Sequence, residues 1–233
     1  MSGNLGSDRH PLDNPAWSAL AGPHAHFAEC RGRAARYPGD VTPFHALPEQ
    51  PGAADWADLA ALVGPKGWAL LAVDAAVRPP ADWEVTFDLE GVQLVGADVV
   101  GKAEPEAVPL GPADVPEMLA LVERTRPGPF LPRTVELGSY LGIRRDGVLI
   151  AMAGERMHPP GHVEISAVCT DPAHRGEGLA SRLVLAVVAG IRERGEIPFL
   201  HAAGDNTNAI RLYEALGFRQ RRAVTFLGAA APA

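Results

Sequence analysis

A strand, a glycine-rich turn and a helix follow one another in the stretch of this sequence best suited to chemistry. The strand is expected over residues 162–170 and the helix over about 176–194. The turn between them contains Arg175, Gly176 and Gly178. Glycine lets the backbone curl tightly, and a helix start presents unpaired N–H donors that suit an anion. Because arginine adds a fixed cation with forked donors, the turn predicts a cradle for a pyrophosphate group.

A second motif lies downstream of this turn. Residues 206–218 read Asn-x-x-Ala-x-x-x-Tyr-x-x-x-Gly-Phe, and the turn itself reads Arg175-x-x-Gly178-x-Ala180. With one helix and one strand between them, the two motifs resemble those of the GCN5-related N-acetyltransferase (GNAT) family. The resemblance covers about residues 106–227, which is the length of one domain.

The resemblance implies a fold and a reaction. The fold class is α/β with a mixed (α+β) sheet, and the acyl-CoA N-acyltransferase fold of the family is expected in the second half of the chain. The reaction is transfer of an acetyl group from acetyl-CoA to a primary amine by direct attack in a ternary complex, without a metal. Such a transfer needs an acceptor for the amine proton, a donor for the oxyanion and a proton for the leaving thiolate.

The cofactor is expected along the strand, the turn and the last helix. The N–H groups of residues 176–181 should hold the pyrophosphate, and the main chain around Val168 and Thr170 should pair with the pantetheine arm as an added strand does. By resemblance, one of these N–H groups also polarises the thioester carbonyl. The predicted cofactor-binding residues are Val168, Cys169, Thr170, Arg175, Gly176, Glu177, Gly178, Leu179, Ala180, Ser181 and Asn206.

The predicted catalytic residues are a tyrosine and a base on the central strand. Tyr213 matches the general acid of the family, and the pKa of a phenol lies close enough to that of a thiol to protonate it; the alternative is an aromatic residue that only packs. Strand alternation places Glu164 and His162 on one face. In the family a strand carboxylate near this position often takes the amine proton, so the resemblance implies Glu164 as first candidate base, His162 as second and Glu155 as third. A surface carboxylate near the strand start is an equally weighted alternative for Glu164. Cys169 faces the other way without a His-Asp pair, so a thiol nucleophile is not expected.

The acceptor amine is expected to lie against a proline-rich connector over residues 126–134. Its prolines exclude regular structure, and in the family the segment after the first helix forms one wall of the acceptor site. Phe130, Arg133 and Thr134 are therefore predicted substrate contacts. A packed connector with a solvated arginine is an equally weighted alternative.

Two units are predicted along the chain: an N-terminal α/β accessory unit over residues 1–104, in one interpretation a degenerate GNAT-like copy, and a GNAT domain over 105–228. The predicted helices cover 15–30, 55–63, 113–125, 176–194 and 207–216. The predicted strands cover 67–73, 83–87, 92–95, 141–145, 148–157, 162–170, 198–202 and 218–227. Asp146-Gly147 is a typical two-residue hairpin turn.

Composition narrows the choice of partners. The net charge of −7 argues against a general nucleic-acid binder and is compatible with a cationic acceptor, so a small-molecule or peptide amine is expected. Cys30 and Cys169 offer no disulfide framework, and no signal peptide or membrane span is predicted, which favours a cytoplasmic protein without membrane contact. The 22 prolines and 25 glycines, with abundant alanine, suggest a high-GC bacterial genome. His24 and His26 lack a third ligand nearby, so no metal site is predicted. A homodimer is left open.

Two rival functions remain. Gly176-x-Gly178-x-x-Ser181 approaches the dinucleotide fingerprint, but it follows a hairpin rather than a parallel βαβ unit. The other rival is a non-catalytic module that binds acetyl-CoA as a sensor or interaction partner. The complete turn motif and Tyr213 favour an enzyme over this module.

Overall fold

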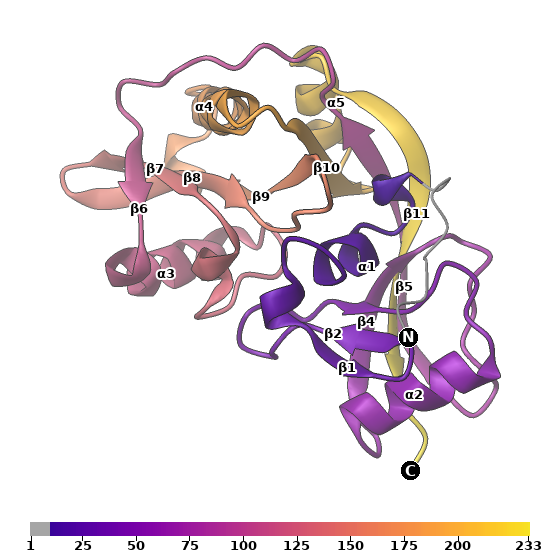
Figure 1. Cartoon of the computed structure of the whole chain (residues 1–233). Helices are drawn as coiled ribbons and strands as arrows, with labels where there is room; N and C mark the ends of the chain where they lie inside the picture. Colours follow the sequence, from indigo (N-terminus) through magenta and orange to yellow (C-terminus); the bar gives the residue numbers. More distant parts are fainter. Residues whose placement is uncertain (1–9) are drawn as a thin grey trace.

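The computed structural model describes residues 10–233, and its centre is one mixed sheet (Figure 1). The strands are β1 (Glu29–Arg31), β2 (Ala34–Arg36), β3 (His45–Ala46), β4 (Trp68–Val73), β5 (Glu84–Val95), β6 (Val108–Leu110), β7 (Tyr140–Arg145), β8 (Val148–Glu155), β9 (His162–Thr170), β10 (Ile197–Ala203) and β11 (Arg219–Ala230). The helices are α1 (Pro15–Leu20), α2 (Ala53–Val63), α3 (Val115–Thr125), α4 (Leu179–Glu193) and α5 (Thr207–Ala215). Short 3-10 turns are η1 (Pro11–Asp13), η2 (Ala25–Phe27), η3 (Pro112–Asp114), η4 (Thr134–Leu137) and η5 (Pro172–His174).

The central sheet has eight strands in the order β4-β11-β5-β10-β9-β8-β7-β6, and β1, β2 and β3 form a small second sheet. In the central sheet of the described chain, β9 and β10 run parallel and every other neighbouring pair is antiparallel. The α/β class with a mixed sheet, predicted from the sequence, is therefore confirmed. None of the helices in residues 10–233 has the length and apolar character to cross a bilayer.

Helices cover both faces of this sheet. Figure 1 shows α3 and α4 on opposite sides of strands β6 to β9. The apolar face of α4 is buried, as its 3.6-residue spacing predicts, and includes Leu183, Val187 and Ile191. At the other end of the sheet, α2 packs Trp56 and Leu59 onto β4 and β11.

Several local predictions are confirmed and two are wrong. The hairpin of β7 and β8 turns at Asp146 and Gly147, both with positive φ, as a type I′ turn requires. The helix predicted over residues 15–30 ends at Leu20, because Gly22-Pro23 interrupts it, and Cys30 lies in β1. The two strands predicted over 83–87 and 92–95 are one long strand, β5.

Strand β5 joins the two halves of the chain. It lies between β10 and β11 and pairs with both, so strands from either side of residue 104 alternate in one sheet. Gly91 lets both neighbouring strands pack closely against β5, because a Cβ there would lie 2.6 Å from the ring of Phe226 on β11 and 2.9 Å from the carbonyl oxygen of Ala202 on β10. The division at residues 104 and 105 stays a prediction, and residues 1–9 of the first unit lie outside the described residues.

This arrangement predicts that residues 105–228 do not fold alone. Without β5, the long strand β11 and the edge of β10 lose their shared partner, and both expose unpaired backbone groups. We expect the isolated fragment to be insoluble, or to unfold without a cooperative transition, while the full chain melts cooperatively in circular dichroism. A soluble fragment with a cooperative melt would contradict this and support two independent units.

Candidate functional site

The site begins where the parallel strands β9 and β10 part. They pair at only three positions, the last of which joins Glu164 to Phe199. Beyond it, the β10-facing edge of Ile165 to Thr170 has no strand partner. On the other side, β9 carries a bulge: Ser166 pairs with Gly154 and Cys169 with Met152, which leaves an extra residue in β9.

The bulge holds an unusual backbone conformation. Ala167 has a φ of 53°, in the left-handed region that non-glycine residues seldom adopt. Such a conformation costs about 1–2 kcal/mol and persists only where the surroundings impose it, often at functional sites. In this chain, Ala167 lies three residues after Glu164, the last residue of β9 that pairs with β10. Its conformation lets β9 bend away from β10 at this separation, which we call the parting.

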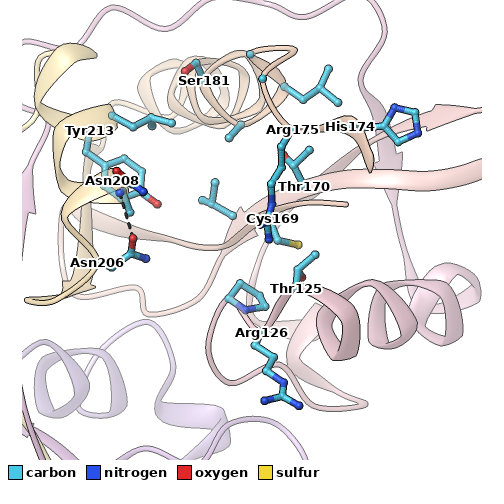
Figure 2. Close-up of a pocket in the computed structure, with 18 residues that line it drawn as sticks. Thr125, Arg126, Cys169, Thr170, His174, Arg175, Ser181, Asn206, Asn208 and Tyr213 are labelled. Atoms are coloured by element: carbon cyan, nitrogen blue, oxygen red, sulfur yellow. Dashed lines mark hydrogen bonds between the residues drawn. The ribbon is translucent and has the colours of Figure 1, made fainter. Parts of the chain in front are cut away.

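A cavity of about 510 Å³ opens between the end of β9, the start of α4 and the start of α5 (Figure 2). We call it the loop cavity. Ten of the eleven predicted cofactor residues line it: Val168, Cys169, Thr170, Arg175, Gly176, Gly178, Leu179, Ala180, Ser181 and Asn206. The eleventh, Glu177, is exposed outside the lining, and its carboxylate accepts a hydrogen bond from His174 Nδ1, at 3.0 Å.

The backbone of the turn is shaped for a ligand rather than for packing. Gly176 and Gly178 have φ of 84° and 74°, and a Cβ on either would meet nothing within 4 Å. Their requirement for glycine is therefore conformational. Among the described residues, no acceptor pairs with the N–H groups of residues 175–181, which include the first turn of α4. These donors converge at the positive end of a 15-residue helix.

Two arginines at the loop cavity add positive charge. Arg126 and Arg175 line it, and within residues 10–233 neither side chain has a hydrogen-bond or ion-pair partner. Thr170 Oγ1 is buried and likewise without a partner in the described chain. Unsatisfied buried polar atoms are rare, and with the turn these groups fit a ligand rich in phosphate oxygens and amides.

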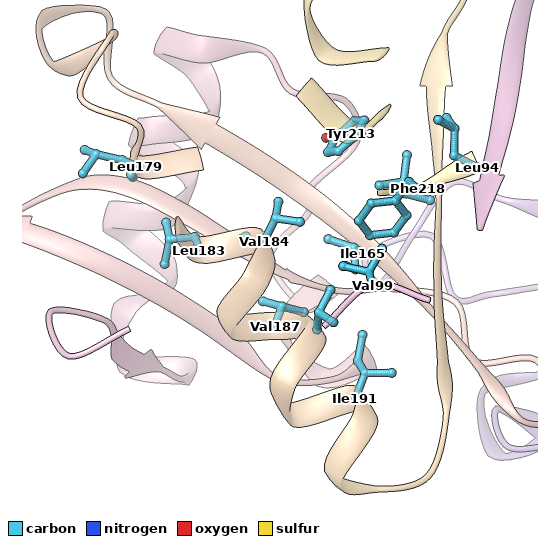
Figure 3. Close-up of a cluster of buried hydrophobic side chains, with 14 of the residues drawn as sticks. Leu94, Val99, Ile165, Leu179, Leu183, Val184, Val187, Ile191, Tyr213 and Phe218 are labelled. Atoms are coloured by element: carbon cyan, nitrogen blue, oxygen red, sulfur yellow. The ribbon is translucent and has the colours of Figure 1, made fainter. Parts of the chain in front are cut away.

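Tyr213 stands where the loop cavity meets a second cavity, because it lines both. Its ring is fixed by the core: it makes an edge contact with Phe218 at 6.0 Å, beside the buried face of α4 (Figure 3). Burial raises the pKa of Tyr213 to about 12, with a smaller contribution from Cys169. The phenol is therefore protonated at neutral pH and has a proton to donate.

The second cavity, of about 590 Å³, lies on the other side of the parting. We call it the aromatic cavity, after Phe44, Trp68, Phe87 and Phe226 in its wall. It shares Tyr213 and five other residues with the loop cavity: Arg126, Pro127, Val168, Asn206 and Ala209. A ligand held in one cavity can thus touch a ligand held in the other.

Buried charges lie at the deep end of the aromatic cavity. Glu164 is fully buried and takes two hydrogen bonds from Arg156, at 2.8 and 2.6 Å, and one from His201 Nδ1, at 2.7 Å. Burial alone would raise the pKa of Glu164, but Arg156 and His201 outweigh it and hold the pKa far below its usual value. Arg156 and His201 line the cavity, whereas Glu164 lies behind them.

The other predicted site residues lie elsewhere. His162 is at the opposite end of β9, with its Nδ1 3.0 Å from the carbonyl of Pro160, outside both cavities. Glu155, the third candidate base, is bound by Arg194. His24 is buried and contacts Tyr37 Oη at 3.1 Å, and no cluster of metal-ligating side chains occurs in residues 10–233.

The predicted acceptor contacts also lie outside both cavities. Phe130 is buried against Tyr140 at 5.5 Å, and Arg133 is paired with Glu136 and Asp40. Thr134 donates a hydrogen bond to the carbonyl of Val41, at 2.6 Å. The same connector does reach the aromatic cavity, but through the preceding residues 126–129.

Sequence reasoning missed His201 and the aromatic wall. His201 lies two residues beyond Phe199, the last residue of β10 that pairs with β9, so alternation places it on the same face as Phe199. The parallel pairing of β9 with β10, had it been predicted, would have placed His201 close to Glu164. Trp68 and Phe87 come from strands whose position in the sheet is set by long-range pairing, which the local pattern does not reveal.

The thiol in the loop cavity is unsuited to act as a nucleophile. Burial raises the pKa of Cys169 to about 11, so the thiolate is scarce at neutral pH. The reactive groups that the two cavities bring together are therefore Tyr213 at their junction and His201 with Glu164 behind it.

Comparison with known proteins identifies relatives of this arrangement. Residues 140–227 match the family model of FR47-like proteins. A solved structure from Novosphingobium aromaticivorans, assigned to the GNAT family, superposes with a TM-score of 0.88 at 41% identity and covers 97% of this chain and 100% of its own. A GCN5-related N-acetyltransferase from Kribbella flavida shares the fold, with a TM-score of 0.60 at 18% identity over 93% of this chain and 94% of its own.

Curated relatives match over a shorter stretch. The N-alpha-acetyltransferase RimI of Mycobacterium tuberculosis is 33% identical over 84 residues, which are 35% of this chain and 52% of that protein. The mycothiol acetyltransferase of Nocardiopsis dassonvillei is 35% identical over 91 residues, 35% of this chain and 27% of that protein. The chain thus spans about half or less of the length of these relatives.

The buried network of Arg156, Glu164 and His201 predicts a large loss of stability when Arg156 is replaced. Arg156→Met should leave the Glu164 carboxylate buried without its main partner and lower the free energy of unfolding by about 3–5 kcal/mol. Because the folded pKa of Glu164 is lowered, its stabilisation is present above an unfolded pKa of about 4.3 and is lost as pH falls below it. The deficit of the variant should therefore shrink as the pH falls below about 4.3, because the wild type progressively loses this stabilisation there.

Urea unfolding at several pH values measures this deficit. Arg133→Met is the matched control, since it removes an exposed arginine from its pairs with Asp40 and Glu136, and little change is expected. Equal stability of the two variants would show that the buried network contributes no more than an exposed pair.

Proposed function

This chain belongs to the GCN5-related N-acetyltransferase family, and on that premise we propose that it transfers an acetyl group from acetyl-CoA to a primary amine. The observation that carries the proposal is the junction of two cavities at Tyr213, one suited to phosphates and amides and the other to an apolar acceptor. Bound acetyl-CoA would supply the activated acetyl group. The reaction forms a C–N bond, breaks the C–S bond and moves one proton from the amine and one to the sulfur.

The loop cavity fits acetyl-CoA. The free N–H groups of residues 175–181 and the unpaired Arg126 and Arg175 suit its phosphates. The unpaired edge of β9 after Glu164 suits the pantetheine amides, which would extend the sheet as an added strand. Asn206 is occupied as the cap of α5, since its Oδ1 accepts from Ala209 N at 3.2 Å, and its amide remains free for a ligand.

The proposed acid is Tyr213. It lies at the junction of the cavities, and its raised pKa keeps the proton in place until the sulfur leaves. As the C–S bond breaks, negative charge develops on the sulfur, and the protonated phenol can give its proton there, which is the role of a general acid.

The proposed route for the amine proton is His201, held by Glu164. Because Glu164 is enclosed by Arg156 and its pKa is lowered, the carboxylate is a poor direct base. It can accept a hydrogen bond from His201 Nδ1, which leaves Nε2 as the basic nitrogen, at present 3.2 Å from Gln93 Nε2. Glu164 would therefore act as a positioning residue and His201 would take the proton, directly or through water.

Cofactor affinity should depend on Arg175. Arg175→Gln removes a forked cation from the loop cavity and should weaken acetyl-CoA binding about tenfold at low salt, measured by isothermal titration calorimetry. The loss should diminish as salt is raised, because screening weakens the contact in the wild type too. Arg211→Gln is the control, because Arg211 lies on α5 outside both cavities and also lacks a partner in the described chain.

Turnover should depend on the hydroxyl of Tyr213. Tyr213→Phe should lower the rate of thiol release with a reactive amine about 100-fold while the affinity for acetyl-CoA is kept, because only the acid is removed. Tyr140→Phe is the matched control: its buried hydroxyl has no partner in residues 10–233 and lies outside both cavities. If neither the wild type nor the variant releases thiol with any amine, while both bind acetyl-CoA, the sensor function is supported instead.

A further inference from the structure

The aromatic cavity is built on a sheet face that the N-terminal half of the chain supplies. Along β4 and β11, alternate residues face opposite ways: Ala69, Leu71 and Leu227 are covered by α2, whereas Leu70 and Phe226 face the cavity. Strand register places them in rows, with Leu70 opposite Gly228 and Phe226 opposite Leu89. The sheet therefore has an apolar surface on both sides: α2 packs on one, and the aromatic cavity opens on the other.

Two aromatic side chains are left partly open on this surface. Trp68 is 44% exposed and Phe87 is 40% exposed, although both line the cavity. They approach each other across Gly228, where a Cβ would lie 3.0 Å from both Phe87 Cβ and the Trp68 ring. The absence of a side chain at Gly228 thus gives the cavity a wall of two rings. Removal of such apolar area from water by a bound ligand contributes favourably to the free energy of binding.

The cavity continues from these rings to the reacting groups. The aromatic wall includes Phe226, whose ring lies 6.0 Å from that of His201. Tyr213 and Val168 belong to both cavities. A ligand whose body lies on the aromatic wall can therefore place one end at the junction where Tyr213 stands.

The charges around the two cavities limit the chemical group that a ligand can place at their junction. Among the described residues, no Asp or Glu lines either cavity. Glu164, behind the aromatic cavity, is already ion-paired with Arg156. The free charges near the junction are positive, from Arg126 and Arg175. A polyamine or an aminoglycoside would bring several ammonium groups into this cavity without a carboxylate to pair them, which is costly.

From this wall, we infer that the acceptor is a primary monoamine carried on a flat apolar body, of the arylalkylamine class. The inference rests on the proposed acetyl transfer and adds to it the substrate class and a role for the N-terminal half. The ring system lies against Trp68 and Phe87, and the single amine, once neutral, reaches the junction at Tyr213. The amine gives its proton toward His201 as the C–N bond forms, so that no ammonium group stays in the cavity.

Binding is tested apart from chemistry with three probes. In the absence of acetyl-CoA, calorimetry or the fluorescence of the tryptophans should detect 2-phenylethylamine and the unreactive 2-phenylethanol, and spermidine should bind at least tenfold more weakly than 2-phenylethylamine. Tight binding of spermidine, or no binding of either aromatic probe, would overturn the inference. Because these measurements do not require turnover, their outcome is independent of whether acetyl transfer occurs.

Variants locate the bound ring. Trp68→Ala and Phe87→Ala should each raise the dissociation constant of 2-phenylethylamine about five- to tenfold. Val85→Ala is the matched control, because Val85 is also apolar and half-exposed on β5 but lies outside the cavity lining. Thermal melts of all three should stay close to that of the wild type, since the truncated side chains are partly exposed. Unchanged affinity in both cavity variants with unchanged melts would place the amine elsewhere.

A thiol-release assay then separates the two proposals. With acetyl-CoA present, release stimulated by 2-phenylethylamine but not by spermidine supports both. Release stimulated only by spermidine or by peptide amines supports acetyl transfer and overturns the acceptor class. Binding of the aromatic probes without thiol release from any amine overturns acetyl transfer but supports the aromatic site.

Discussion

The bridge that Glu164 makes at the point where β9 and β10 separate is the interaction on which the site depends. Its carboxylate joins Arg156, which follows β8, to His201 on β10, two residues beyond the last paired position of the two strands. The Glu164 side chain is fully buried and those of Arg156 and His201 are nearly so, and the hydrogen bonds among them join the strands at this end of the parting. Strands β9 and β10 are thereby tied at one end and free at the other, where both cavities open.

The two halves of the chain contribute different parts of the candidate site on either side of the parting. On one side, the turn before α4 offers free N–H groups and Arg175, all within the stretch 168–181. On the other side, β4 and β5 contribute Trp68 and Phe87, which are more than 80 residues earlier in the chain. Tyr213 connects the sides because α5 is packed by Phe218 against the core under α4. The N-terminal half therefore belongs to the site as well as to the sheet.

Local and long-range features differed in how far the sequence could predict them. The turn with Gly176 and Gly178 and the position of Tyr213 follow from short motifs, because conformation and spacing there are local. The path of the connector was not predictable, since Thr134 is held by the carbonyl of Val41, a contact across 93 residues. The place of β5 between β10 and β11 was equally hidden, because strand order in a sheet depends on pairing partners that alternation does not name.

The position of β11 has a consequence for how the chain reaches its native state. Strands β4 and β5 do not touch in the sheet; each is joined to the other through β11, the final strand of the sequence. During vectorial synthesis, β4 cannot join the central sheet, and β5 lacks one of its two neighbours, until residues 219–230 have emerged. Pairing between strands so far apart in the sequence gives a high contact order, which slows folding and favours aggregation-prone intermediates. Nascent chains of this protein are therefore expected to rely on chaperones, and early termination within β11 would leave β4 without its neighbour in the central sheet.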